Sequence, residues 1–126
     1  MLWHEQRAHT DARRRGFYDI IPRLSGEMNF TDMNAGAISG LHCHRIHTDY
    51  LTVAKGSILV RLVYEDGRAE EKFVFKEQSR RTLIIPPGVW HGYRAIEPSI
   101  LVFYIDRKYD PADELKRETR PEEWKI

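Results

Sequence analysis

The sequence is poor in cysteine, in net charge and in long apolar runs. Its 126 residues contain one cysteine, so no disulfide can form within the chain, which is typical of a reducing compartment. Twenty basic residues against nineteen acidic ones leave a formal net charge of +1, which gives no general attraction to nucleic acid. No apolar segment is long enough to cross a bilayer, and the start of the chain lacks the apolar stretch of a signal peptide. The sequence therefore predicts a soluble, cytoplasmic protein that binds neither nucleic acid nor membranes.

Short β-branched and apolar runs, separated by turn residues, fill most of the chain. Residues 57–64 and 70–75 flank the turn sequence Glu65-Asp66-Gly67 and predict a β-hairpin. Further strands are expected at residues 17–21, 33–44, 82–85 and 99–105. Strands at this spacing favour a β-sandwich or a small barrel. The length fits one domain, residues 1–126, with a core at about 15–110, a charged N-terminal arm and a charged C-terminal tail.

Three of the six histidines lie in the stretch GLHCHRIHTDY, residues 40–50. On a β-strand alternate side chains share a face, so His42 and His44 point one way and Cys43 points the other. At a rise of ~3.3 Å per residue the two imidazoles start roughly 7 Å apart. Such a pair suits a metal ion or an acid–base site, while two hydrogen-bonded polar residues are the plainer alternative. Cys43 is expected to be a small core residue, and His47 a solvated residue or a loop ligand.

The spacing around this pair resembles the first motif of the cupin superfamily. The matching positions are Gly36, His42, His44, Asp49 and Gly56, with aspartate where metal-binding members usually carry glutamate. Pro86-Pro87-Gly88 followed by His91 resembles the core of the second cupin motif. The resemblance implies an all-β fold, a single-domain cupin jelly-roll barrel with short terminal arms. It also implies that His42, His44, Asp49 and His91 face the mouth of the barrel.

The segments IPPGVWHGYRA, VFYIDRKYDPADE and DARRRGFYDI resemble a narrower branch of the cupins. This is the sugar-nucleotide branch that contains dTDP-4-dehydrorhamnose 3,5-epimerase and the dTDP-4-keto-6-deoxyhexose 3,4-ketoisomerases. Its arginine-glycine-aromatic segment, which helps to bind the nucleotide diphosphate, is matched by Arg15 and Phe17. Its catalytic base is matched by His42, a second histidine by His91, and the general acid of the epimerases by Tyr104. The resemblance implies a nucleotide-sugar substrate.

The chemistry of a 4-keto sugar gives these residues consistent roles without a cofactor. Epimerisation or ketone migration begins by removing a proton next to the carbonyl, which an imidazole can do near neutral pH. We expect His42 to be the base, His44 or His91 to stabilise the enolate oxygen, and Tyr104 to return a proton. Asp49 is expected to fix the tautomer of one imidazole and, with the arginine-aromatic segment, to form the substrate-binding set.

Two other functions remain open at this point. Three imidazoles and one carboxylate (His42, His44, His91 and Asp49) suit a divalent transition metal, which would make the protein a metal-dependent isomerase or oxygenase. A non-catalytic ligand-binding cupin would keep the same pocket.

We also expect a homodimer in which the N-terminal strand, with Arg15 and Phe17, is exchanged between subunits. The family resemblance implies this exchange, and the polar first dozen residues cannot cover an apolar edge strand.

Overall fold

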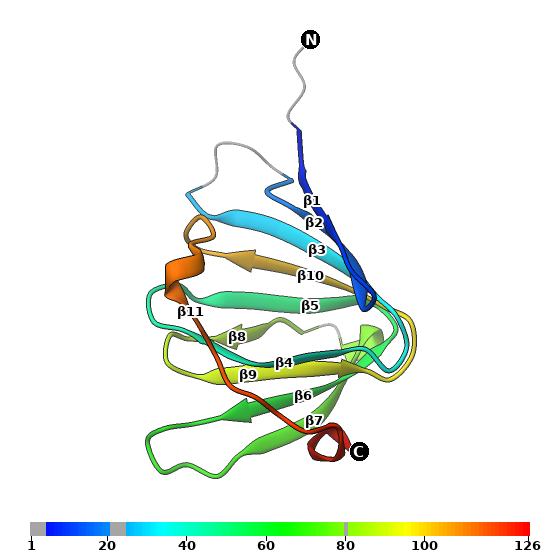
Figure 1. Ribbon diagram of the computed structural model, residues 1–126, viewed down its shortest axis with the longest axis vertical. Coiled ribbons are helices and arrows are strands. Elements are labelled where there is room, and N and C mark those ends of the chain that lie inside the picture. The colour runs from blue at the N-terminus through cyan, green and yellow to red at the C-terminus, as the bar shows by residue number, and fades with distance from the viewer. Residues whose placement is uncertain (1–4, 21–24, 80) are drawn as a thin grey trace.

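The structure is a computed structural model that describes residues 5–20, 25–79 and 81–126, and it consists of two antiparallel β-sheets (Figure 1). The first sheet has the strand order β1 (Arg7–Thr10), β2 (Arg14–Tyr18), β3 (Glu27–Met33), β10 (Ser99–Ile105), β5 (Asp49–Lys55) and β8 (Leu83–Ile85). The second has the order β11 (Glu114–Lys116), β4 (Ile38–His44), β9 (Trp90–Ala95), β6 (Ser57–Val63) and β7 (Glu71–Lys76). The predicted all-β jelly-roll fold is confirmed.

In the described ranges, three short 3-10 helices join or follow the strands: η1 (Glu77–Ser79), η2 (Pro111–Asp113) and η3 (Pro121–Trp124). No helix among the described residues is long and apolar enough to span a membrane.

The predicted hairpin is the β6–β7 pair, in register from Ser57 opposite Lys76 to Leu62 opposite Glu71. It begins at Gly56, whose φ of 89° lies in the left-handed region. A Cβ at this position would lie 2.6 Å from the carbonyl oxygen of Pro98, so the turn from β5 into β6 requires glycine.

The strand predicted at 17–21 is displaced in the structure, where β2 covers residues 14–18. Asp19 has a φ of 55° and its backbone N–H donates to Asn29 Oδ1 at 2.9 Å, so the extended backbone stops there. Residue 21 lies outside the described residues. Strand β3 was not predicted, because its inward residues are mostly polar: Glu27, Asn29 and Thr31 precede the apolar Met33.

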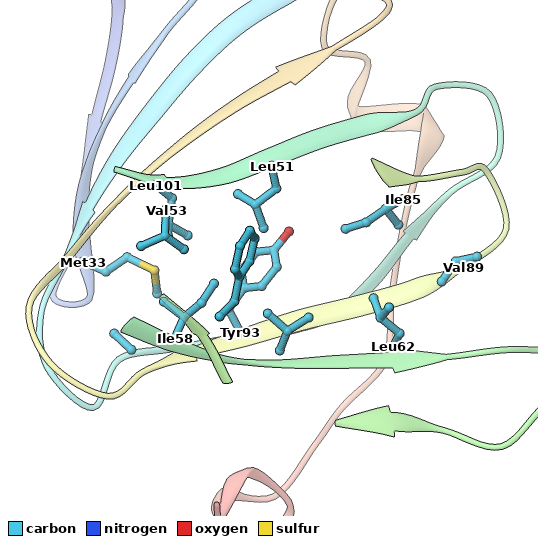
Figure 2. Packing of buried hydrophobic residues seen from close by; sticks show 12 residues of the cluster. Met33, Leu51, Val53, Ile58, Leu62, Ile85, Val89, Tyr93 and Leu101 are labelled. Carbon is cyan, nitrogen blue, oxygen red and sulfur yellow. The ribbon is translucent and has the colours of Figure 1, made fainter. Parts of the chain in front are cut away.

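The main hydrophobic core lies between the sheets, where β5, β6 and β9 contribute most of its side chains (Figure 2). Its fully enclosed members include Leu51, Ile58 and Val60, each at most 1% exposed. Burial of such aliphatic side chains stabilises a fold by about 1.5–3 kcal/mol each.

A second hydrophobic cluster is formed by Leu41, Cys43, Trp90 and Trp124, so the prediction that Cys43 is a core residue is confirmed.

Both terminal segments that the sequence assigns to arms carry strands. Strand β1 pairs with β2, and β11 pairs with β4. Beyond β11 the chain continues to Trp124, which is 1% exposed. A Cβ on Gly92 would lie 2.6 Å from the Trp124 ring, so this glycine makes room for the indole. The part of the chain after Asp110 therefore packs on the second sheet.

Candidate functional site

A cavity of about 680 Å³ opens between the two sheets. One wall comes from β1, β2, β3, β5 and β10, and the other comes from β4, β9 and β11. Its volume falls within the ~300–1,000 Å³ typical of small-molecule sites.

Three of the predicted site residues meet in this region as a cluster of imidazoles. His42 and His44 share a face of β4, and His91 lies opposite His42 on the neighbouring strand β9. The ring centroid of His42 is 4.1 Å from that of His91 and 5.4 Å from that of His44. The strand alternation expected for the pair is therefore present, and the second cupin motif supplies the third ring.

His42 has a single free ring nitrogen when it is neutral. Its Nδ1 lies 3.0 Å from the carbonyl oxygen of Gly40 and donates to it, which leaves the lone pair on Nε2. Burial, and next the neighbouring His91, lower the pKa of His42 to about 3. Burial also lowers the pKa of His44. His42 is therefore an unprotonated imidazole at neutral pH, as a general base must be.

Asp49 is buried at 6% exposure between two imidazoles. Its Oδ1 lies 2.8 Å from His47 Nε2, and its Oδ2 lies 3.3 Å from His91 Nε2. Burial alone would raise the pKa of Asp49, but the neighbouring rings of His47 and His91 outweigh burial and hold the pKa well below its usual range. The carboxylate is therefore ionised beside the cluster.

His47 is a site residue that the sequence did not assign. It is 3% exposed rather than solvated, and its Nδ1 lies 3.7 Å from Asp113 Oδ2. Burial lowers its pKa, yet the close contact with Asp49 and the charges of Asp49 and Asp113 outweigh that effect, so the pKa of His47 is raised. No local sequence signal indicates this contact, because Asp113 arrives from the tail that was expected to lie apart from the core.

Tyr104 is not brought to the histidines. The cavity is lined by its neighbours Phe103 and Ile105, and the Tyr104 hydroxyl instead accepts from the backbone N–H of Gly26 at 3.1 Å. The predicted general acid therefore lies on the opposite face of β10, because side chains alternate along a strand and the motif fixes only a distance in sequence.

Arg15 and Phe17 also lie away from the cavity. Arg15 is bonded to Asp32 at 2.6 Å, and the Phe17 ring stacks on Phe30 with centroids 4.8 Å apart. The residue of β2 that lines the cavity is Arg14, one position earlier. Its Nε is buried without a hydrogen-bond partner among the described residues, which marks a cation free to receive an anionic ligand.

Two further residues join the cavity wall from the second sheet. Tyr93, two residues after His91, presents its ring and hydroxyl between the sheets (Figure 2). Burial raises the pKa of Tyr93, the charge of Asp49 adds to this rise, and the charge of Arg14 opposes it. Lys116 of β11 lies directly across from His42 in the strand pairing, so both side chains share the cavity face.

Within the part of the chain that the structure describes, two sets of side chains have donor atoms close enough together to hold a metal ion: His42, His44 and His91, and His44, His47 and Asp49. The rings of His44 and His47 are nearly stacked, with centroids 3.9 Å apart and planes 30° apart, so their in-plane lone pairs do not converge well. The first set, whose rings are inclined at 43° to 81°, fits a transition metal better, and Asp49 lies beside it.

Comparison with known proteins gives both a family match and similar folds. The family described as "FdtA: WxcM-like, C-terminal" matches residues 28–120. A "Probable low-salt glycan biosynthesis epimerase Agl13" from Haloferax volcanii is 30% identical over 119 residues, which cover 86% of this chain and 75% of the relative.

Among solved structures, the capsular polysaccharide assembling protein CapF from Staphylococcus aureus has a TM-score of 0.80 at 16% identity over 93% of this chain. Oxalate decarboxylase from Bacillus subtilis has a TM-score of 0.76 at 17% identity over 88% of this chain. This chain spans 33% and 30% of those two chains, and the likeness concerns the fold alone.

Proposed function

The chain belongs to the WxcM-like, C-terminal family, a group of sugar-modifying, epimerase-type cupins, and from this premise we propose that it epimerises or isomerises a nucleotide-linked 4-keto-6-deoxy sugar. The observation that carries the proposal is His42, a neutral imidazole with its basic Nε2 free, in a cavity large enough for a small-molecule substrate.

The reaction would begin when His42 removes the proton next to the ketone. The pKa of about 3 keeps this imidazole unprotonated before the reaction. The enolate carries a negative charge close to the ring, and this charge favours the imidazolium that forms. The removed proton thus stays on His42 while the electron pair moves onto the carbonyl oxygen.

The enolate oxygen needs a positive or hydrogen-bonding partner, and the carbon needs a proton donor. Arg14 and Lys116 are cationic side chains of the cavity wall for which no ion pair is seen within the described residues. Tyr93 replaces Tyr104 as our candidate proton donor, because its raised pKa keeps the hydroxyl protonated and it lines the cavity.

The nucleotide diphosphate would lie along the edge formed by β1 and β2. Arg7 and Arg13 also line the cavity there, but Arg7 is paired with Glu27 at 2.8 Å and Arg13 with Asp11 at 3.1 Å. Arg14 is therefore the residue we assign to the first phosphate contact, in place of Arg15.

The homodimer with an exchanged N-terminal strand and the cytoplasmic location stay predictions. Sedimentation of the purified protein measures the first, and fractionation of the source cells measures the second.

A metal-dependent enzyme is the second candidate, and the imidazole cluster favours it. His42 and His91 each place Nδ1 3.0 Å from a backbone carbonyl oxygen, the arrangement that orients histidine ligands in metal sites. When bound to His42, His44, His91 and Asp49, a divalent transition metal would polarise the substrate carbonyl. Asp49, whose Oδ2 lies 3.3 Å from His91 Nε2, would then contribute an oxygen to the metal.

The test is product analysis by NMR with a panel of nucleotide-linked 4-keto-6-deoxy sugars. We expect the protein, stripped of metal by a chelator and checked by elemental analysis, to convert at least one of them to an epimer or a ketone isomer. Activity that disappears with the metal and returns with it would replace the cofactor-free mechanism by the metal-dependent one. Tight binding of the sugars, seen as a rise in melting temperature without turnover, would indicate a binding protein.

A further inference from the structure

We propose that His47 is a positioning residue that spaces two buried carboxylates, Asp113 and Asp49, and thereby aims Asp49 at His91. The catalytic consequence rests on the proposed function, whereas the orientation of His91 can be measured without it.

The contacts form a continuous line from the C-terminal segment to the imidazole cluster. Asp113 Oδ2 lies 3.7 Å from His47 Nδ1, and His47 Nε2 lies 2.8 Å from Asp49 Oδ1. The second oxygen of Asp49 lies 3.3 Å from His91 Nε2. The ring of His91 is in turn 4.1 Å from that of His42, centroid to centroid. All members of this line from Asp113 to His91 are at most 8% exposed.

The loop that carries His47 is held at both ends by carboxylates. The backbone N–H groups of Arg45 and Ile46 donate to Asp113 at 2.9 and 3.3 Å, and that of Thr48 donates to Asp106 at 3.0 Å. Asp113 therefore contacts both the loop backbone and the His47 ring, whereas Asp106 is seen to bond only the loop backbone within the described residues. A substitution of Asp106 is therefore a matched control for loss of loop anchoring without loss of the His47 contact.

The geometry gives His47 a role that Asp49 cannot fill alone. A buried carboxylate next to a single imidazole can rotate about its Cβ–Cγ bond, and either oxygen can face the partner. With His47 fixed against one oxygen, only the other is left for His91. His91 then places its Nε2 beside Asp49, while its Nδ1 lies 3.0 Å from the carbonyl oxygen of Val89. In metal sites, removing the partner that orients a histidine ring typically costs about 10–100-fold in metal affinity or activity, and we expect a loss of the same order here.

The first measurement uses the free protein and long-range 1H–15N NMR of its histidine rings. We expect His47→Ala and Asp113→Asn to move the ring-nitrogen resonances of His91, and Asp106→Asn to leave them in place. His47→Asn, whose amide is too short to bridge both carboxylates, should behave like His47→Ala and serves if the alanine variant does not fold. Unchanged His91 signals in a folded His47 variant would overturn the proposal.

The second measurement uses the substrate found in the product assay. We expect His47→Ala to lower kcat by about 10–100-fold while KM changes by less than about twofold, and His47→Gln to recover part of the loss because its amide N–H can still donate to Asp49. Asp106→Asn should stay within about twofold of wild type. An equal loss in Asp106→Asn would mean that only loop order matters, and the positioning role would be dropped. If no sugar is converted, the proposed function fails while the NMR result still decides the role of His47.

Discussion

The same strands build both a cavity end and a core end of the space between the sheets, and the two ends differ in chemistry. Along β9 the inward side chains run from His91 through Tyr93 to Ala95, and along β5 they run from Asp49 to Leu51 and then Val53. Polar groups thus give way to apolar ones within a single strand. The alternation of side chains along a strand determines on which face of the sheet a residue lies. The position of the residue along the strand determines whether its side chain packs in the core or lies at the site.

The largest expected effect separates the cavity end from the core end by function. His42→Ala should lower turnover by about 10²–10⁴-fold, because it removes the base. The free energy of unfolding should change little or rise, since a buried polar ring is lost from an open cavity. Steady-state kinetics and urea unfolding measure the two quantities. Turnover within a few-fold of wild type would remove His42 from the mechanism.

A substitution at the core end should have the opposite effect and change stability but not turnover. Leu51→Ala should lower the free energy of unfolding by about 2–5 kcal/mol, because Leu51 is 1% exposed and its loss leaves a cavity. Turnover per folded molecule should stay close to wild type at low temperature. Ile84→Ala, on the neighbouring strand and 59% exposed, is the control and should cost less than about 0.5 kcal/mol. A comparable cost in both variants would contradict the assignment of the core.

A pair of neighbouring arginines tests which face of β2 belongs to the cavity. Arg14→Ala should raise KM by about 10–100-fold, since a charged hydrogen bond to an anionic substrate is worth about 1.5–3 kcal/mol. Arg15→Ala, which breaks only the exposed pair with Asp32, should leave KM within about twofold. The reverse order would restore the interpretation in which Arg15 binds the diphosphate.

The smallest expected effect is on the pH dependence of stability. The pKa of His42 is about 3 in the folded protein and near 6.5 when the ring is free, so the unfolded chain binds more protons between these values. The free energy of unfolding should therefore fall as the pH is lowered from 6.5 towards 3. Urea unfolding of His42→Gln between pH 6.5 and 4.5 should show a shallower fall. The exposed His9→Gln variant controls for loss of a histidine, and equal slopes in all three proteins would contradict the buried, neutral His42.

Much of the fold and the centre of the site could be predicted because they depend on local pattern. The alternation within GLHCH correctly placed His42 and His44 on one face and Cys43 on the other. The two motifs also correctly placed His91 beside His42, with ring centroids 4.1 Å apart, although His91 is buried behind the cavity wall and does not line it. These relations involve either one strand or a pair of adjacent strands.

The contacts that were not predicted depend on longer-range geometry. The thirteen residues from His91 to Tyr104 include the turn between β9 and β10. Their number alone does not determine on which face of β10 the tyrosine side chain lies. Arg15 was selected by its motif, but the register of β2 turns Arg14 inward. His47 and Asp113 meet only because the C-terminal segment folds back on β4, and a charged segment with few apolar residues gives no signal of that packing.

The most direct test of a neutral histidine base at the cavity end is incorporation of solvent deuterium into a nucleotide-linked 4-keto-6-deoxy sugar. In heavy water, the wild-type protein should introduce deuterium at the carbon next to the ketone. NMR or mass spectrometry measures the deuterium content of the sugar over time. Tyr104→Phe should do so at a rate within about twofold, because its hydroxyl contacts Gly26 on the far face of β10. His42→Ala should show no incorporation above the uncatalysed rate. Equal incorporation by wild type and His42→Ala would contradict the account.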